Sequence, residues 1–374
     1  MRIAVNTRLL ITGKMDGIGW FSFHSLKILV NKNPQHDFFF IFDRDFDVKY
    51  IFNQNVTPVI LSPPTRHPFL WYIWFEHRIP AILKKYKIDF FLSPDGFLSL
   101  NSDVLSLPVI HDINFAHKPE DLPFFTRRFY NIFFPKYAKK AKRIVTVSEY
   151  SKQDICKTYD IKPENVDVVY NGSSSLYKPV SKSVKLKIKK KYAEGKNYFI
   201  FIGSLHPRKN VPRLFQAFEL FKKQTKSDFK LVIVGGMMFK NQELNNVHSQ
   251  MKFSSDVIFT GRLAPQELKN VLGSAFALTF VPYFEGFGIP ILEAMHSEIP
   301  VITSNITSMP EVAGDAALYI DPFSVESIKN GMVTLYNDKK LRISLVEKAK
   351  IQREKFSWEL TADKLWRSIE KCLN

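Results

Sequence analysis

The chain has 374 residues, a formal net charge of +17 and 45% hydrophobic residues. This composition excludes a disordered or fibrous chain, and the length predicts two domains, or one unusually large one. Cys156 and Cys372 are too few for a disulfide framework or a multi-thiolate zinc site, which indicates a reducing compartment.

Neither a secretory signal nor a membrane-spanning helix is predicted. Residues 1–8 carry charges on both sides of a short apolar stretch, and the apolar run at residues 69–75 stops at Glu76, far short of the ~18 residues that a spanning helix needs. We therefore expect a cytoplasmic protein. Its positive charge suggests a polyanion, an anionic membrane or an anionic small substrate as a partner.

Short apolar strands alternate with longer amphipathic segments, a pattern typical of βαβ units and parallel sheets. In the first half, strands are predicted at residues 2–6, 37–42, 57–61, 88–93, 108–111, 143–148 and 166–170, and helices at 19–31, 69–86, 123–140 and 149–159. In the second half, strands are predicted at 197–203, 230–235, 256–260, 275–280, 300–303 and 316–320, with a helix at 211–223 and an amphipathic helix at 356–373.

The domain boundary is predicted between Asn171 and Lys196. This segment holds Asn171-Gly172, a serine triplet and a lysine cluster, which cannot bury enough apolar surface to continue either core. We therefore predict an N-terminal domain at residues 1–172, a linker at 173–196 and a C-terminal domain at 197–355. The last helix, within residues 356–374, is expected to pack back on the N-terminal domain.

Two strand-to-helix turns are candidates for binding an anion. Gly17 and Gly19 follow the first strand, where backbone N–H groups can approach a phosphate, although a tight turn explains these glycines slightly better. Arg208 and Lys209 follow the strand at 197–203. Arginine can bind two phosphate oxygens and lysine adds a point charge, while Asn210 is a good N-cap for the next helix. The second turn is the stronger candidate.

The most informative segment is residues 285–293, EGFGIPILE. Its two glycines make a turn with unobstructed amides, and Pro290 fits the first turn of a helix. Glu285 and Glu293 are too far apart to share one helical turn, so the first is expected in the loop and the second on the helix. Such carboxylates can accept hydrogen bonds from the hydroxyls of a sugar and of a ribose.

Two further features lie at strand ends in the first half. His111 precedes Asp112, and it is either a site residue or an ordinary loop histidine. Asp43-Arg44-Asp45 has the DxD pattern that holds a metal ion in some enzymes. No histidine supports it here, and we interpret it as a solvated loop.

Together these segments resemble one family, the retaining GT-B glycosyltransferases of family four, also known as glycosyl transferases group 1. The resemblance runs nearly from end to end, and the E-x7-E element at residues 285–293 is its specific feature. The supporting segments appear in the order of the family: residues 17–19, His111-Asp112, 146–151 (TVSEYS), Asn171-Gly172, Gly203 with Arg208-Lys209-Asn210, and 308–317 (SMPEVAGDAA).

The resemblance implies a role for each of these residues. Arg208 and Lys209 would bind the donor diphosphate and stabilise the leaving nucleotide, Glu285 would hold the transferred sugar, and His111 would orient it. These four, His111, Arg208, Lys209 and Glu285, are the implied catalytic residues. The implied donor-binding residues are Gly17, Gly19, Gly203, Arg262 beside the base, Gly286, Phe287, Gly288, Ile289 and Glu293 on the ribose.

The resemblance also implies a fold and a reaction. Two Rossmann-like, doubly wound α/β domains would face a central cleft, the N-terminal one binding the acceptor and the C-terminal one the nucleotide sugar. A hexose of the mannose or glucose type would pass from a GDP- or UDP-sugar to a glycan or lipid-linked acceptor in cell-surface polysaccharide or lipopolysaccharide synthesis. Neither a metal nor another cofactor is expected, because two basic side chains and helix dipoles supply charge stabilisation.

The sequence departs from the family on the acceptor side. Asn6 stands where the family often has aspartate, and Trp20 where arginine commonly follows the glycine pair. The identity of the acceptor therefore cannot be inferred from the family. Another GT-B enzyme, such as a nucleotide-sugar epimerase or a sugar phosphorylase, is an alternative that the E-x7-E element argues against. A nucleic-acid-binding protein is suggested only by the net charge and lacks a recognised motif, so no nucleic-acid partner is expected.

Residues 124–136 mix aromatic and cationic side chains, and a cluster of lysines and Arg143 follows them. Together with the region from Trp71 to Trp74, this segment is predicted to rest on an anionic leaflet, which would make the protein peripheral on the inner face of the membrane. A buried helix face with solvated lysines is the alternative.

Overall fold

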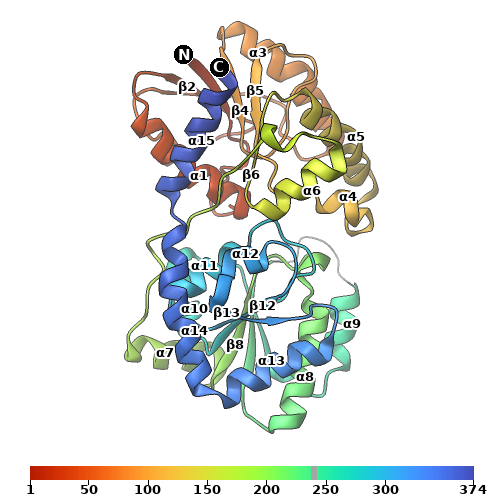
Figure 1. Ribbon diagram of the computed structural model, residues 1–374, viewed down its shortest axis with the longest axis vertical. Helices are drawn as coiled ribbons and strands as arrows, with labels where there is room; N and C mark the ends of the chain where they lie inside the picture. Colours follow the sequence, from red (N-terminus) through yellow and green to blue (C-terminus); the bar gives the residue numbers. More distant parts are fainter. Residues whose placement is uncertain (237–241) are drawn as a thin grey trace. The chain divides into compact units, whose positions relative to one another are not determined.

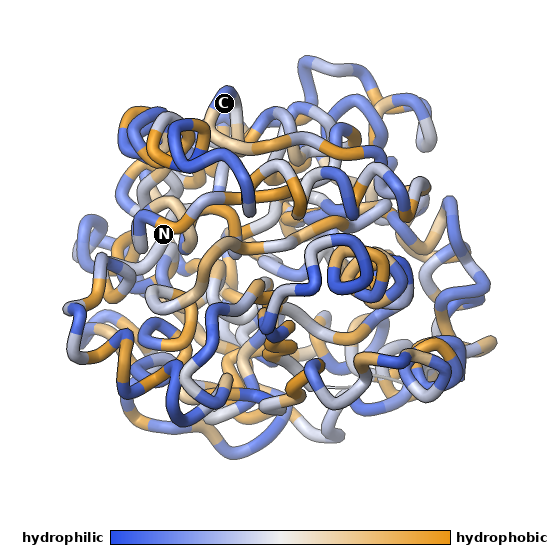
Figure 2. The backbone as a smooth tube through the Cα atoms, turned by 90° about the horizontal axis from the view of Figure 1, so that it is seen from below, coloured by the Kyte–Doolittle hydropathy of each residue, from blue (hydrophilic) through white to orange (hydrophobic). Residues whose placement is uncertain are grey.

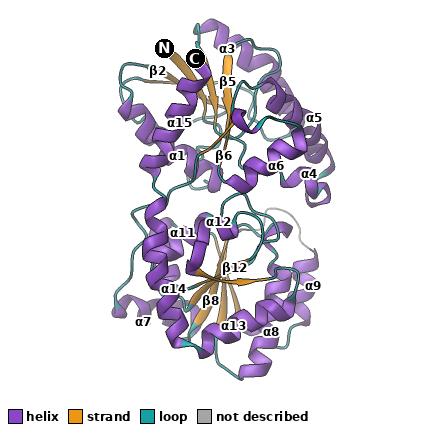
Figure 3. Cartoon of the chain, viewed as in Figure 1, coloured by secondary structure: helices purple, strands orange, loops and turns teal. Residues whose placement is uncertain are grey.

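The computed structural model describes residues 1–236 and 242–374, which form two compact units. Unit 1 consists of Met1–Gly172 and Phe356–Asn374, and unit 2 consists of Ser173–Lys355 (Figure 1). Both are α/β units with a twisted parallel sheet covered by helices on its two faces (Figure 3). The chain therefore contains two Rossmann-like domains, as its alternating pattern predicts.

Unit 1 has a parallel sheet with strand order β3-β2-β1-β4-β5. Its strands are β1 (Arg2–Asn6), β2 (Asp37–Phe42), β3 (Val56–Ile60), β4 (Phe90–Ser93) and β5 (Leu105–Pro108), and a short parallel pair, β6 (Ile144–Thr146) and β7 (Val166–Val168), adjoins them. Ile3 pairs with Phe38 on one side and Phe90 on the other. The predicted strand at 108–111 starts earlier and ends at Pro108, after which Val109 only bridges to Val145.

The helices of unit 1 cover both faces of this sheet. They are α1 (Gly17–Lys32), α2 (Pro68–Ile73), α3 (Ile79–Lys85), α4 (Asn114–His117), α5 (Phe124–Lys140), α6 (Glu149–Tyr159) and α15 (Trp358–Leu373). Helices α1 and α15 lie together on one side, whereas α5 and α6 lie on the other (Figure 1). The abundant phenylalanines fill the space between the layers, since Phe38, Phe40, Phe90 and Phe97 are almost completely buried.

Helices α2 and α3 form one rod that is interrupted by a π-helical turn, Trp74–Arg78. Pro80 lies just after this turn and has no N–H to donate to the carbonyl of Glu76. The side-chain amide of Asn101 donates to that oxygen instead, at 3.0 Å. The predicted helix at 69–86 is thus present, but it contains one π-helical turn next to the proline, a usual cause of distortion in a helix.

Helix α15 belongs to unit 1 although it is the last element of the chain. The ring of Trp358 stacks on His24 of α1 with centroids 4.9 Å apart, and burial lowers the pKa of His24 to about 4. A Cβ atom on Gly172 would lie 2.3 Å from the backbone nitrogen of Trp358, so only glycine fits there. The apolar residues Leu360 and Trp366 are not among the buried residues of this helix.

Unit 2 has a parallel sheet with strand order β10-β9-β8-β11-β12-β13. Its strands are β8 (Tyr198–Ile202), β9 (Lys230–Val234), β10 (Val257–Gly261), β11 (Ala277–Phe280), β12 (Val301–Ser304) and β13 (Ala317–Ile320). Its helices are α7 (Lys182–Ala193), α8 (Val211–Thr225), α9 (Gln242–Gln250), α10 (Pro265–Gly273), α11 (Ile289–His296), α12 (Met309–Ala313), α13 (Val325–Asn337) and α14 (Lys339–Gln352).

The segment predicted as a linker, residues 173–196, is part of unit 2 and contains helix α7. The hydroxyl of Ser181 caps this helix, and α7 packs on α10, β9 and β10 through buried Ile188 and Ala193. The prediction was wrong because a lysine can lay its aliphatic stem along an apolar surface and keep its charge in water. A few apolar positions therefore suffice to dock a lysine-rich helix.

Short hydrophobic and hydrophilic stretches alternate along both described parts of the chain (Figure 2). Within residues 1–236 and 242–374, no helix is both long enough and apolar enough to cross a membrane.

Candidate active site

The predicted site residues of unit 2 lie where the winding of its sheet reverses. The chain runs outward from β8 to β10 and then returns to β11, which pairs with the other side of β8. At such a switch point the loops after the two central strands turn in opposite directions, and ligands bind at the carboxyl ends of the strands there. Arg208 and Lys209 follow β8, and Glu285 follows β11.

These three side chains form one ionic cluster. Nη1 of Arg208 donates to Oε2 of Glu285 at 2.7 Å and to the carbonyl of Phe284 at 3.2 Å. Nζ of Lys209 donates to the same carboxylate oxygen and lies 4.9 Å from the centre of the Phe280 ring. Lys209 is buried and Arg208 is partly exposed, so the guanidinium is the more accessible of the two cations.

The two cations set the charge of Glu285. Burial alone would raise the pKa of this carboxyl, but the positive charges and hydrogen bonds of Arg208 and Lys209 outweigh burial and hold the pKa below its ordinary value. Glu285 is therefore a carboxylate at neutral pH, and one oxygen atom, Oε2, receives hydrogen bonds from both cations.

Local backbone structure positions the cations. The turn Pro207–Lys209 is capped by the ring of His206, whose Nδ1 accepts from the backbone N–H of Arg208 at 3.3 Å. Asn210 then adopts a left-handed conformation, φ 62°, and α8 begins. The expected capping role of Asn210 is wrong: its side-chain amide donates to the carbonyls of Val281 and Pro322 and so ties this loop to the loops after β11 and β13.

Glycine ends three adjacent strands of unit 2. Gly203 follows β8, Gly235 follows β9, and Gly261 is the last residue of β10. The side chain of Arg262 is exposed and lies near Gly236, where a Cβ atom would be 3.6 Å from Nε of the arginine. The structure thus brings Gly203 and Arg262, two of the predicted donor-binding residues, to the same edge of the sheet as Arg208.

Residues 285–293 form a loop followed by helix α11. Gly288 has a φ of 94°, a conformation that favours glycine, and Pro290 occupies the first turn of the helix. The hydroxyl of Ser308 donates to the carbonyl of Glu285 at 2.8 Å and fixes the loop. The side chain of Phe287 is buried, so Phe287 anchors the turn, whereas the backbone of Gly286, Gly288 and Ile289 shapes it.

Glu293 lies on α11 and differs sharply from Glu285. Burial raises the pKa of Glu293 to about 7, although a hydrogen bond with Tyr177 opposes this rise. The pKa of the buried Tyr177 phenol is itself raised, mainly by burial. Sequence reasoning missed Tyr177, because it stands in a segment without a motif and meets Glu293 only in the folded unit.

His111 belongs to unit 1 and follows β5. Its Nε2 lies 2.8 Å from the carbonyl of Pro94, which can only accept, so Nε2 carries the proton. Burial lowers the pKa of His111, and the ring is therefore neutral at pH 7, with Nδ1 as its acceptor nitrogen. Phe21 of α1 packs edge-on against the imidazole at 5.0 Å and holds its plane.

Gly17 and Gly19 are at the start of α1, as the sequence predicts, but one of their amides is already used. The carboxylate of Asp16 caps the helix and accepts from the N–H of Gly19 at 3.1 Å. A phosphate at this helix end would have to compete with Asp16 for that N–H. The support for an anion here is accordingly weaker than at Arg208.

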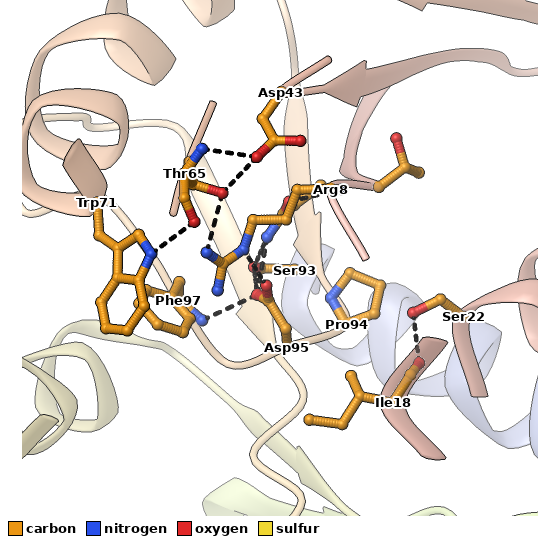
Figure 4. A network of polar contacts seen from close by, with 12 residues as sticks. Arg8, Ile18, Ser22, Asp43, Thr65, Trp71, Ser93, Pro94, Asp95 and Phe97 are labelled. Atoms are coloured by element: carbon orange, nitrogen blue, oxygen red, sulfur yellow. Dashed lines mark hydrogen bonds and ion pairs between the residues drawn. The ribbon is translucent and has the colours of Figure 1, made fainter. Parts of the chain in front are cut away.

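The corresponding switch point of unit 1, between β1 and β4, holds a buried ion pair (Figure 4). Nε of Arg8 lies 2.5 Å from Oδ2 of Asp95, and the guanidinium carbon lies 4.1 Å from the centre of the Phe97 ring. The side-chain amide of Asn6 donates to the other oxygen of Asp95 at 2.7 Å. The hydroxyl of Thr65 accepts from Arg8 at 3.3 Å.

Asp43 extends this network and corrects the interpretation of the DxD pattern. The carboxylate of Asp43 is almost fully buried, accepts from the N–H and hydroxyl of Thr65, and forms an ion pair with Arg44. Asp43 is therefore a structural residue and not part of a solvated loop. In the part of the chain that the structure describes, no group of three or more His, Cys, Asp or Glu side chains could hold a metal ion.

Two family models match this chain. One, described as Glycosyl transferases group 1, matches residues 184–352, and the other, described as Glycosyltransferase Family 4, matches residues 27–173. The first match covers Arg208, Lys209, Glu285 and Glu293, and the second covers His111.

Curated relatives and solved structures agree with these models. O-antigen chain mannosyltransferase B of Escherichia coli is 29% identical over 278 residues, which are 74% of this chain and 73% of that protein. O-antigen chain mannosyltransferase RfbU of Salmonella typhimurium is 32% identical over 213 residues, 57% of this chain and 56% of that protein. The structure of Anabaena HepE in complex with UDP-glucose has a TM-score of 0.74 and 18% identity, covering 99% of this chain and 100% of that chain.

Proposed function

This chain belongs to the GT-B glycosyltransferases of the family 4 type, and on that basis we propose which reaction it catalyses. It transfers a hexose of the mannose or glucose type from a GDP- or UDP-sugar to a glycan or lipid-linked acceptor, with retention of anomeric configuration. The setting is lipopolysaccharide or O-antigen synthesis, which the names of the mannosyltransferase relatives support. We place the reaction on the cytoplasmic side of the membrane.

The cluster of Arg208, Lys209 and Glu285 at the switch point of unit 2 carries this proposal. A diphosphate that binds the two cations replaces Glu285 as their partner. The released carboxylate then accepts hydrogen bonds from hydroxyls of the sugar that the diphosphate carries. One exchange of partners thus places the phosphates beside positive charge and the sugar beside Glu285.

The same cations stabilise the charge that develops during transfer. When the bond between the anomeric carbon and the phosphate oxygen breaks, negative charge accumulates on the leaving nucleotide diphosphate, next to Arg208 and Lys209. Preorganised positive groups in a partly buried site are worth far more than in water. His111, neutral with Nδ1 as its acceptor, would receive a hydrogen bond from the donor sugar and orient it.

The test is a panel of UDP- and GDP-sugars screened for thermal stabilisation and for slow hydrolysis. We expect one donor, with GDP-mannose as the first candidate, to stabilise the protein and to be hydrolysed with retention, as read from the anomeric proton by NMR. The reaction should continue in excess EDTA, because the protein supplies the cations. Failure of every donor would contradict the proposal, and loss of activity with EDTA that Mg²⁺ restores would contradict metal independence.

Donor affinity is expected to depend on the ionisation of Glu293. With a pKa of about 7, the side chain is mostly neutral at pH 6 and mostly ionised at pH 8. Only the carboxylate can accept hydrogen bonds from both hydroxyls of a ribose, so affinity should rise about tenfold across this range. Isothermal titration calorimetry with the active donor, at pH 6 and at pH 8, measures this change in affinity.

The matched variant is Glu293→Gln, which keeps the size of the side chain and removes its titration. Its donor affinity should be weaker and should not change between the same two pH values. If donor affinity changed with pH as much in the variant as in the wild type, or did not change with pH in the wild type, Glu293 would not be the residue that binds the ribose.

A further inference from the structure

Helices α2 and α5 of unit 1 carry exposed aromatic side chains on adjacent surfaces. Phe124 and Phe125 of α5 are 56% and 63% exposed, and Phe69 of α2 is 65% exposed. The ring of His67, the residue that caps α2, lies 6.0 Å from that of Phe125, so the two helices form one continuous patch. We call the exposed residues of α2 and α5, with Arg66 and His67, the aromatic-basic face.

The outward positions of α5 follow a helical repeat. Phe125, Arg128, Ile132, Lys136 and Lys139 recur at intervals of three or four and are exposed, as is the neighbouring Phe124, whereas Phe129, Phe134 and Tyr137 are buried against the core. The first turns of the outward side are apolar and its last turns are cationic. The seventeen residues of α5 extend about 25 Å, long enough to lie along a surface.

The charge of this face has one sign. Residues 124–143 contain seven basic side chains and no acidic one. In the described part of the chain, no carboxylate lies within ion-pair distance of Arg66, Arg128, Lys136 or Lys139. The acidic residues that come just before the helix in the sequence are Glu120 and Asp121, and Glu120 pairs with Lys118 at 3.8 Å.

From this arrangement we infer that the aromatic-basic face docks on an anionic lipid bilayer. Exposed phenylalanines enter the boundary between headgroups and acyl chains, and arginine and lysine beside them contact lipid phosphates. Within the region from Trp71 to Trp74, only Tyr72 has an exposed side chain. Trp74 is completely buried, and Trp71 is directed inward, where its indole N–H donates to the carbonyl of Thr65 at 2.9 Å.

Vesicle co-sedimentation of the full chain tests this inference without donor or acceptor, so its outcome does not depend on the proposed reaction. The wild type should sediment with phosphatidylcholine vesicles that also contain phosphatidylglycerol, and much less with phosphatidylcholine alone. Phe124→Ala with Phe125→Ala, and separately Arg128→Glu with Lys136→Glu, should each weaken partitioning at least about tenfold.

Lys187→Glu with Lys190→Glu on α7 is the matched control, because it changes the net charge equally on an exposed helix of unit 2. This variant should partition like the wild type. No dependence on anionic lipid, or an equal loss in the control, would overturn the inference. So would a change in oligomeric state, rather than in vesicle binding, when the two phenylalanines are replaced.

Discussion

Replacing Arg208 with alanine is expected to lower the rate of sugar transfer by at least about a hundredfold, the usual cost of removing one preorganised group that stabilises a transition state. The fold should survive, because Glu285 keeps its contact with Lys209 and is not left as an unpaired buried carboxylate. Initial rates at saturating donor, together with thermal unfolding, separate a loss of chemistry from a loss of structure.

Arg213→Ala is the matched control for this variant. Arg213 lies in the first turn of α8, close in sequence to Arg208, but its guanidinium donates to the side chain of Asn210 at 2.9 Å instead of to Glu285. Its transfer rate should stay close to that of the wild type. Glu285→Gln should lose transfer as Arg208→Ala does. Near-normal transfer by a folded Arg208→Ala or Glu285→Gln protein would remove these residues from the mechanism.

Asp95→Asn is expected to destabilise unit 1 by about 3 kcal/mol, because it leaves the buried guanidinium of Arg8 without a counter-charge. The unfolding of this unit can be followed by itself. All five tryptophans, Trp20, Trp71, Trp74, Trp358 and Trp366, belong to unit 1, so denaturation monitored by tryptophan fluorescence does not report on unit 2.

The double variant Arg8→Met, Asp95→Asn should recover most of this loss. Asparagine still offers an oxygen to Asn6 and to the N–H of Phe97, which both donate to Asp95, and methionine packs well against the Phe97 ring. A double variant no more stable than Asp95→Asn alone would show that the lost stability does not come from the unpaired charge.

The sequence was informative where a residue's place on a strand or helix decides its role. Arg208, Lys209 and Glu285 were each expected just after a strand, and the structure brings them together at the carboxyl ends of two neighbouring strands. Glycine, proline and capping residues also marked where the elements begin and end. Helix α6 has the bounds that its pattern predicts.

Contacts between residues far apart in the chain could not be predicted in this way. Arg8 and Asp95 are separated by 87 positions, and neither stands in a recognisable motif. Tyr177 forms a hydrogen bond with Glu293, which is more than a hundred residues away in the sequence. Asp43 has a structural role because Thr65, from a separate loop, donates hydrogen bonds to its carboxylate. Burial by a distant segment changes the chemistry of a side chain without leaving a local signal.

The placement of α15 has a consequence for synthesis on the ribosome. Unit 1 is interrupted by the whole of unit 2, so the chain must make residues 173–355 before the helix that covers α1 exists. At about 5–20 residues per second, this delay is on the order of 10–40 s. During that interval Phe21 and His24 of α1 lack their partner Trp358, and the nascent unit presents an uncovered aromatic surface on which chaperones can act. The first domain to emerge is thus the last to be completed.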